Sequence, residues 1–157
     1  MSAIVRAITR CGGVIEKFVG DGVLVTFGAR SDVSNSAERA VAAALASVGA
    51  NEALNRRRSA EWGFRLDVGV GIASGRIVLG RIGPPERAEH GVLGDAINIA
   101  ARLVSRAGPG EILLSANVHR ALGGKVRAEL LGSQAVAGRA GADEICRIAL
   151  LGRNLGT

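Results

Sequence analysis

Two short apolar runs on either side of an Asp-Gly pair constrain the fold of this chain most. The runs cover residues 14–19 and 23–27, and Gly20, Asp21 and Gly22 stand between them. Because Asp-Gly fits the tight turn that joins twisted antiparallel strands, the pattern predicts a β-hairpin. Residues 2–11 before it carry apolar side chains at helical spacing and end at Gly12-Gly13, which predicts a short helix.

The remaining segments give alternating helix and strand signals. Asn35 followed by Glu38 resembles a helix start, and the helix is expected to run to about Leu54, with Arg56-Arg57-Arg58 near its end. Residues 64–72 alternate strictly, as in a half-buried strand, and 77–79 should be their hairpin partner before a polar loop at 83–85. Further on we expect helices over 95–106 and 117–122 and strands over 112–114, 126–130 and 144–150. This order predicts one α+β domain, residues 1–157, with a largely antiparallel sheet.

Composition limits the core and the partners. Aromatic residues make up 3% of the 157 residues and hydrophobic residues 48%, so Val, Ile, Leu and Ala must build the core. The net charge of +6 favours anionic partners such as nucleotides, nucleic acid or acidic membrane surfaces. Cys11 and Cys146 form no CxxC pair, and His90 and His119 have no zinc spacing. No apolar run reaches membrane length, so we expect a soluble cytoplasmic protein with reduced thiols.

Two longer stretches resemble the catalytic domain of class III adenylate/guanylate cyclases. The first runs from Gly12 to Gly22 (GGVIEKFVGDG) and ends in Phe27-Gly28; the second includes VGVGIASG at 68–75, GDAINIAARL at 94–103 and GEILLS at 110–115. The resemblance implies a ferredoxin-like cyclase fold, with a mainly antiparallel sheet flanked by helices. It also implies a head-to-tail dimer, in which each active site takes residues from both protomers. Two Mg²⁺ or Mn²⁺ ions, held by two aspartates of one protomer, would bind the nucleoside triphosphate.

Asp21 and Lys17 acquire roles through this resemblance. By itself, Asp21 is the residue that a tight turn favours, and Lys17 is an ordinary solvated lysine. The resemblance makes Asp21 the second metal aspartate, since a hard oxygen ligand suits Mg²⁺ or Mn²⁺. It makes Lys17 the residue that reads the purine. Because an ammonium group can only donate, Lys17 fits N1 of adenine and favours ATP over GTP.

Asn98 and Arg102 are spaced four residues apart, so they share one face of the expected helix. Alone they are a polar surface pair. The resemblance implies that Asn98 orients the ribose and that Arg102 donates to the phosphoryl oxygens as charge develops. Asp95 is expected to be the N-cap of this helix. A neighbouring apolar face is expected to pack on the core and consists of Ile97, Ala101 and Val104. Two interpretations, a phosphate-attracting surface and ordinary solvated charge, stay open for Arg76, Arg81 and Arg87.

The sequence departs from the family pattern at three places. Met1 falls within the expected end of the family's first helix, so the central first strand with the other metal aspartate is expected to be missing, which leaves free strand edges. Gly91 stands seven residues before Asn98, where adenine-specific members carry Asp or Thr. The lysine expected before a glycine near the penultimate strand is absent from both candidates, Ala137-Gly138 and Ala140-Gly141.

The sequence therefore predicts an adenylate cyclase-type domain of intracellular signalling that converts ATP to cyclic AMP and pyrophosphate. It is expected to be truncated, weakly active or inactive alone, and to dimerise with itself or a full-length cyclase. One alternative is a non-catalytic cyclase-homology module that dimerises or binds nucleotide. Another is a basic nucleic-acid-binding domain, but no aromatic stacking platform is evident, so no nucleic-acid partner is expected.

Overall fold

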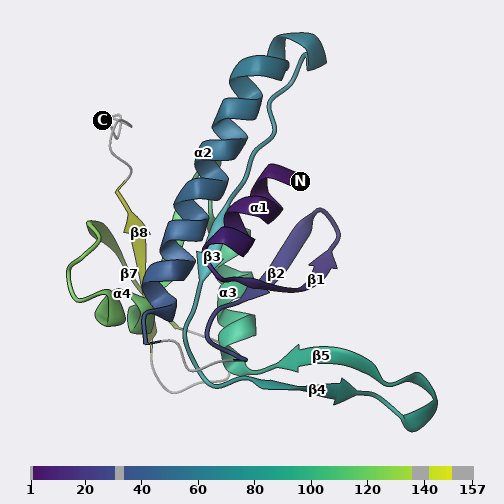
Figure 1. Ribbon diagram of the computed structural model, residues 1–157. Coiled ribbons are helices and arrows are strands. Elements are labelled where there is room, and N and C mark those ends of the chain that lie inside the picture. The colour runs from purple at the N-terminus through teal and green to yellow at the C-terminus, as the bar shows by residue number, and fades with distance from the viewer. Residues whose placement is uncertain (1, 31–33, 136–141, 150–157) are drawn as a thin grey trace.

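The computed structural model describes residues 2–30, 34–135 and 142–149 (Figure 1). Helices and strands alternate along the described chain, as the sequence predicted. In order, they are α1 (Ser2–Arg10), β1 (Val14–Val19), β2 (Gly22–Thr26), α2 (Ser36–Trp62), β3 (Val70–Ile72), β4 (Val78–Ile82), η1 (Pro85–Arg87), β5 (Glu89–Leu93), α3 (Asp95–Arg106), β6 (Ile112–Ser115), α4 (Ala116–Leu122), β7 (Ala128–Ala135) and β8 (Ala142–Ile148).

The core is a sheet in the strand order β3-β6-β8-β7, covered on one face by α2 and α4. Strands β3 and β6 run parallel, and the other two pairs are antiparallel, so the expected mainly antiparallel α+β architecture is confirmed. Burial raises the pKa of the Cys146 thiol, and the Glu144 charge adds to this, as befits an inert buried thiol. The buried core is aliphatic, as the composition predicted: Val41, Ala44, Val48, Ile112, Leu114, Val118, Leu122, Cys146 and Ile148.

Helix α3 covers the other face of the sheet because glycines let it approach the backbone. A Cβ added at Gly71 would lie 2.5 Å from the Ala100 carbonyl oxygen and 2.7 Å from the Val104 nitrogen. At Gly69 it would meet Ala107 at 2.9 Å. Only glycine fits such contacts, so the alternation of valine and glycine before Ile72 directs one face of β3 to the core and the other to α3.

The hairpin of β1 and β2 forms a separate two-stranded sheet, and the sequence prediction for it is confirmed. Helix α1 packs on it through Gly13, where an added Cβ would lie 2.7 Å from Ile8 and from Phe27. In the described residues, β2 pairs only with β1, and β3 pairs only with β6. Each of these strands therefore keeps one open edge, which agrees with the expectation of free edges.

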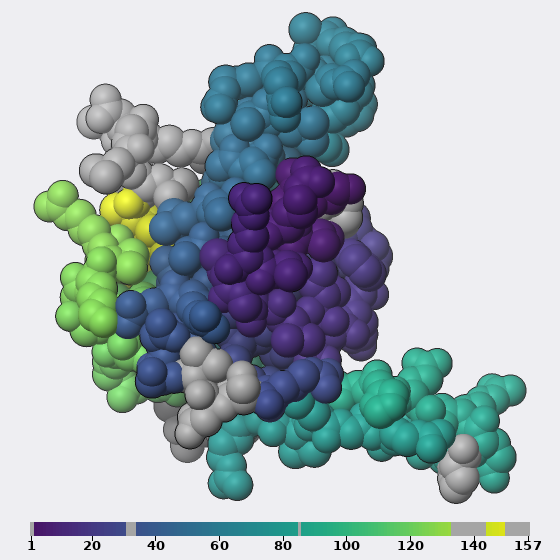
Figure 2. Space-filling model, in the orientation of Figure 1, coloured from purple at the N-terminus to yellow at the C-terminus, as the bar shows by residue number. Residues whose placement is uncertain are grey.

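Strands β4 and β5 form a second hairpin, the arm, which extends away from the body (Figures 1 and 2). The prediction that 77–79 pairs with the strand at 64–72 was wrong: β3 pairs with β6, and β4 pairs with β5. The expected polar loop contains β5 and the turn that η1 makes. One face of the arm exposes Val78, Ile82 and Leu93.

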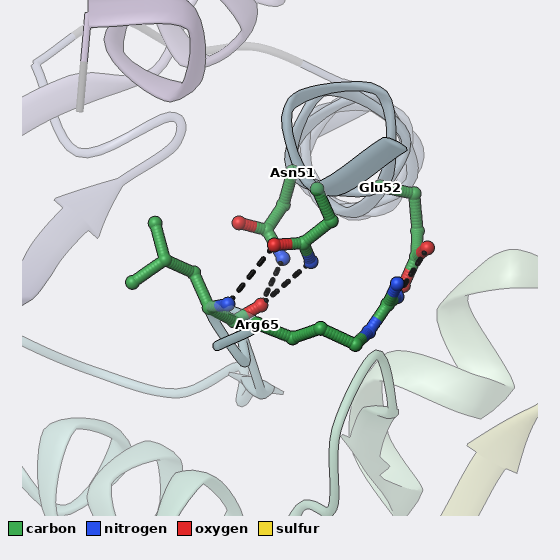
Figure 3. A network of polar contacts seen from close by, with 5 residues as sticks. Asn51, Glu52 and Arg65 are labelled. Atoms are coloured by element: carbon green, nitrogen blue, oxygen red, sulfur yellow. Dashed lines mark hydrogen bonds and ion pairs between the residues drawn. The ribbon is translucent and has the colours of Figure 1, made fainter. Parts of the chain in front are cut away.

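The strand expected over 64–72 is limited to Val70–Ile72, because α2 runs to Trp62 instead of ending near Leu54. The chain then returns along α2 and is held by buried asparagines. Asn55 donates to the Leu66 carbonyl at 2.9 Å and accepts from the Leu66 N–H at 2.9 Å, and Asn51 donates to the same carbonyl at 2.8 Å (Figure 3). These side chains occupy backbone groups that a strand neighbour would otherwise bind.

Candidate functional site

Helix α3 presents Asn98 and Arg102 to solvent. Its buried residues are Ala96 and Leu103, and at 100° per residue Asn98 and Arg102 lie on the opposite side of the helix. Both are exposed, so the prediction that they share one face is confirmed. The neighbouring face is not packed as expected: Ala101 is exposed and Val104 is 48% exposed. The glycines beneath α3 decide this, because the helix packs on them with Ala96, Ala100 and Leu103 turned inward instead.

The start of α3 differs from the prediction. Gly94, with φ +151°, is the N-cap, and Asp95 is the first helical residue, so the N-cap role expected for Asp95 was wrong. An added Cβ at Gly94 would lie 2.5 Å from the Arg76 carbonyl oxygen, which explains why glycine occupies this position. In the first turn, the Asp95 carboxylate still suits the positive end of the helix dipole.

Lys17 and Asp21 lie on the first hairpin. Asp21 is exposed in the turn after Gly20, whose φ is +60°. Lys17 is exposed on β1 and pairs with Leu24. The register shifts between Ile15 and Lys17, so this part of β1 contains a bulge. A bulge re-aims the side chains that follow it, and the direction of Lys17 is therefore set at this point.

Glu16 is the extra residue of this bulge, and sequence reasoning did not single it out. Its side chain is only 7% exposed. The Thr26 hydroxyl donates to one carboxylate oxygen at 2.6 Å, and Arg30 Nη2 donates to the other at 2.8 Å. A buried carboxylate needs such partners, and here they anchor the bulge beside Lys17. No sequence signal marks this role, because the bulge exists only once β1 and β2 have paired.

Gly91 lies in β5 opposite Gly80 of β4. An added Cβ at Gly91 would lie 2.5 Å from Ile82 Cδ1, whereas a Cβ at Gly80 would have nothing within 4 Å. The space of the missing side chain is therefore filled by Ile82, a second residue that the sequence reasoning missed. Glycine at 91 leaves this position without a side chain that could bind a base, and an aliphatic group covers it.

The described residues do not assemble a two-ion centre. They contain no group of three or more His, Cys, Asp or Glu side chains placed to hold a metal ion. A clamp on two ions needs more than the one carboxylate that Asp21 supplies. Ala137-Gly138 and Ala140-Gly141 lie outside the described residues. Arg76, Arg81 and Arg87 are exposed, as solvated charges are.

Three elements carry the five predicted site residues. Asn98 and Arg102 lie together on α3, Lys17 and Asp21 lie together on the hairpin, and Gly91 lies on the arm strand that leads directly into α3. In Figure 1 the hairpin and the arm both extend toward the right of the view. The structure therefore assembles two pairs of residues locally and places the fifth on a projecting element.

The chain matches the family model described as the adenylate and guanylate cyclase catalytic domain over residues 7–148. It is 34% identical over 115 residues to an uncharacterized protein of Mycobacterium tuberculosis, a match that covers 72% of this chain and 20% of that protein. The structure of the guanylyl cyclase Cya2 has a TM-score of 0.85 and 31% sequence identity, and the match covers 94% of this chain and 75% of the Cya2 chain. The adenylyl cyclase CyaB from P. aeruginosa has a TM-score of 0.80 at 28% identity, covering 99% and 81%.

One of these structures is a guanylyl cyclase and the other an adenylyl cyclase, so similarity alone does not choose between ATP and GTP. The chain spans about a fifth of the length of the curated relatives that it matches. No helix of the described residues is long and apolar enough to cross a membrane.

Proposed function

We propose that this chain, which belongs to the adenylate and guanylate cyclase catalytic domain family, takes part in the conversion of ATP to cyclic AMP and pyrophosphate. The observation that carries this proposal is the fixed orientation of α3. Its inner face is seated on the glycines of β3, so Asn98 and Arg102 project outward from a rigid support. Donors held rigidly before the reaction stabilise developing charge better than mobile ones.

Asn98 and Arg102 act on the sugar and the phosphates. In the reaction, the ribose 3′-hydroxyl attacks the α-phosphorus and pyrophosphate leaves. Asn98 holds the ribose so that this hydroxyl faces the phosphorus, which lowers the entropy cost of reaching the transition state. Arg102 donates to phosphoryl oxygens while their charge grows. Both residues stand one helical turn apart on the exposed face of α3, so one nucleotide can reach both.

Lys17 selects the base. Its ammonium group donates to N1 of adenine, which accepts, and it has no acceptor for the N1–H of guanine. The Glu16 bulge, held by Thr26 and Arg30, fixes the strand that carries it. Gly91 makes no side-chain bond to the base, and Ile82 covers that position. The preference for ATP is therefore modest, because it depends on one hydrogen bond.

The second copy or a full-length cyclase completes the site. The arm carries Val78, Ile82 and Leu93 on one exposed face, and such apolar area on a projecting hairpin suits burial in a dimer. Asp21 is available as one ligand for Mg²⁺ or Mn²⁺, but the described residues do not complete a two-ion clamp. The partner's carboxylates are needed for that function in a mixed dimer.

A non-catalytic role is the second candidate. The lack of a carboxylate cluster among the described residues favours it, together with the absence of a base-binding side chain at Gly91. In this case the chain dimerises or binds nucleotide and makes no cyclic AMP. The two candidates share the same fold and differ only in whether Asn98 and Arg102 promote the reaction of a bound nucleotide.

A complementation assay separates the candidates. The chain is mixed with a complete cyclase domain that keeps its metal aspartates but lacks its own equivalents of Asn98 and Arg102, and cyclic nucleotide is measured with Mn²⁺ and ATP or GTP. We expect no product from either protein alone and cyclic AMP from the mixture. Asn98→Ala or Arg102→Ala in this chain should lower the rate at least about 100-fold, the typical cost of losing one such donor. A silent mixture in which a mixed dimer is seen by sedimentation supports the non-catalytic role.

Base choice is tested in the same mixture. Lys17→Glu should raise the GTP rate relative to the ATP rate about tenfold, because a carboxylate accepts from guanine N1–H where an ammonium cannot. Arg76→Gln, an exposed charge change away from the hairpin, should leave the ratio unchanged. A parent ratio that already favours GTP would show that Lys17 does not read the base.

A further inference from the structure

The far end of α2 has no role in the proposed function. We call residues 56–67 the α2 tip. The last buried residue of α2 is Asn55, and the helix continues beyond it to Trp62. In Figures 1 and 2 this end stands clear of the body, at the top of the view. The overhang buries nothing in the core, so core packing does not explain its length.

Aromatic side chains are concentrated at this tip. The sequence holds one tryptophan and three phenylalanines, and Trp62 and Phe64 are both in the tip. Their rings stack with centroids 5.7 Å apart. Phe64 is 57% exposed, and Leu66 beside it is 40% exposed. The chain thus places two of its few large aromatic groups on a projecting element, with Phe64 exposed and Trp62 half-buried, which is typical of a contact surface.

The tip is held in one conformation. Gly63, with φ +72°, closes the helix by donating its N–H to the Ser59 carbonyl at 2.9 Å. Asn51 and Asn55 bind the backbone of Leu66, and Arg65 pairs with Glu52 at 2.9 Å (Figure 3). The backbone is therefore held on both sides of Phe64. A surface that is ordered in advance loses little conformational entropy when it binds.

Charge defines the kind of partner. The tip carries four arginines, Arg56, Arg57, Arg58 and Arg65, against the carboxylates of Glu61 and Asp67. The first three arginines are consecutive and exposed. Arginine beside a half-buried Trp and exposed Phe and Leu is the composition that lies at the headgroup level of anionic membranes. Nucleic acid requires a denser array of cations than four arginines offset by two carboxylates.

We propose that the α2 tip docks on the surface of an anionic phospholipid membrane. The aromatic pair and Leu66 enter the headgroup region, and the arginines lie against lipid phosphates. The projecting shape fits a flat surface, because the tip can touch a bilayer while the hairpin and the arm stay free. Binding is weak and reversible, since three partly inserted side chains and a small excess of arginine carry it.

Trp62 reports on this docking directly, because it is the one tryptophan of the chain. The 157-residue chain is titrated with vesicles of phosphatidylcholine alone and of phosphatidylcholine mixed with phosphatidylserine. We expect a blue shift of the emission and co-sedimentation with the mixed vesicles, both weakened by added salt as the Debye length shortens. Phosphatidylcholine alone should produce little of either.

Variants with matched controls locate the surface. Replacing Arg56, Arg57 and Arg58 by Gln should lower the affinity for mixed vesicles about 100-fold, at roughly fivefold for each arginine. Phe64→Ser should lower it about tenfold. One control variant replaces Arg76, Arg81 and Arg87 by Gln, and the other is Phe18→Ser, which alters an equally exposed phenylalanine. Both should leave the affinity for mixed vesicles within about twofold of the parent value. Thermal melting checks that each variant folds. If Phe64→Ser does not fold, the arginine variant tests the proposal in its place.

Three results would overturn the proposal. One is an equal loss of affinity in the control variants, which would mean that overall charge drives binding. The second is a blue shift that grows with protein concentration without vesicles, which would place the tip against a second copy. The third is a salt-sensitive shift with single-stranded nucleic acid and none with mixed vesicles.

Discussion

Two pairs of glycines show how differently the core and the arm of this molecule use the same residue. Gly69 and Gly71 lie beneath α3, and an added Cβ at Gly71 would stand 2.5 Å from a backbone oxygen. Gly80 and Gly91 face one another across the arm, and a Cβ at Gly80 would meet nothing within 4 Å. In the core, glycine permits two elements to touch; in the arm, it leaves a surface open.

The difference separates two parts of the site. The helix that carries Asn98 and Arg102 is fixed by backbone contacts that no side-chain motion can relax. The strand that carries Gly91 projects from the body, and only the flexible end of Ile82 covers the glycine. The proposed phosphate chemistry thus depends on a rigid element, whereas Gly91, where a side chain would add a second contact to the base, lies on a projecting one.

The largest effect should come from filling the core contact. Gly71→Val forces a branched side chain against the Ala100 carbonyl and the Val104 nitrogen, which are backbone atoms and cannot move aside. We expect a loss of about 3 kcal/mol or more in the free energy of unfolding, measured by urea denaturation. The matched change Gly80→Val in the arm should stay within about 0.5 kcal/mol. Equal losses would show that the two glycine pairs do not differ.

Removing the buried asparagine clamp should have the next largest effect. Asn55 is fully buried and makes two hydrogen bonds to the Leu66 backbone. Asn55→Ala leaves both groups without this partner and should cost about 2 kcal/mol, seen as a lower melting temperature. Hydrogen exchange of the Leu66 amide should speed up as well. Asn51→Ala removes one bond and should cost less; the reverse order would contradict the geometry.

The smallest loss of stability is expected from a substitution on the arm. Gly91→Asp places a Cβ against Ile82 Cδ1, the end of a flexible side chain, so we expect a loss of about 1 kcal/mol. Ile82→Ala should remove most of that loss in the double variant, a coupling that a double-mutant cycle measures. In the complementation assay, the double variant should also prefer ATP more strongly than the parent. Additive losses would mean that Ile82 does not occupy the space over Gly91.

Local patterns in the sequence were sufficient for several elements. The Asp-Gly turn at residue 21 and its apolar flanks predicted β1 and β2. Helical spacing predicted α3 from Asp95 to Arg106, and with it the shared face of Asn98 and Arg102. The aliphatic composition predicted an aliphatic core. In each case neighbours within a few residues decide the outcome, so the signal is present in the chain itself.

Strand pairing and the direction of the site were decided by the tertiary structure. The strand expected over 64–72 forms only over Val70–Ile72, and Asn51 and Asn55, 15 and 11 residues before Leu66, bind the Leu66 backbone instead. The partner of β3 is β6, a strand that lies far along the chain, and no local pattern at 64–72 makes that choice. The bulge at Glu16 and the cover of Gly91 by Ile82 exist only after two strands have met. The sequence by itself determined most of the helices and strands through local periodicity and turn chemistry, although not β5 or the end of α2, and its resemblance to the cyclase family singled out the residues of the site. Only the folded structure decided which edges stay open and which side chains face one another, because those depend on contacts that close over long loops.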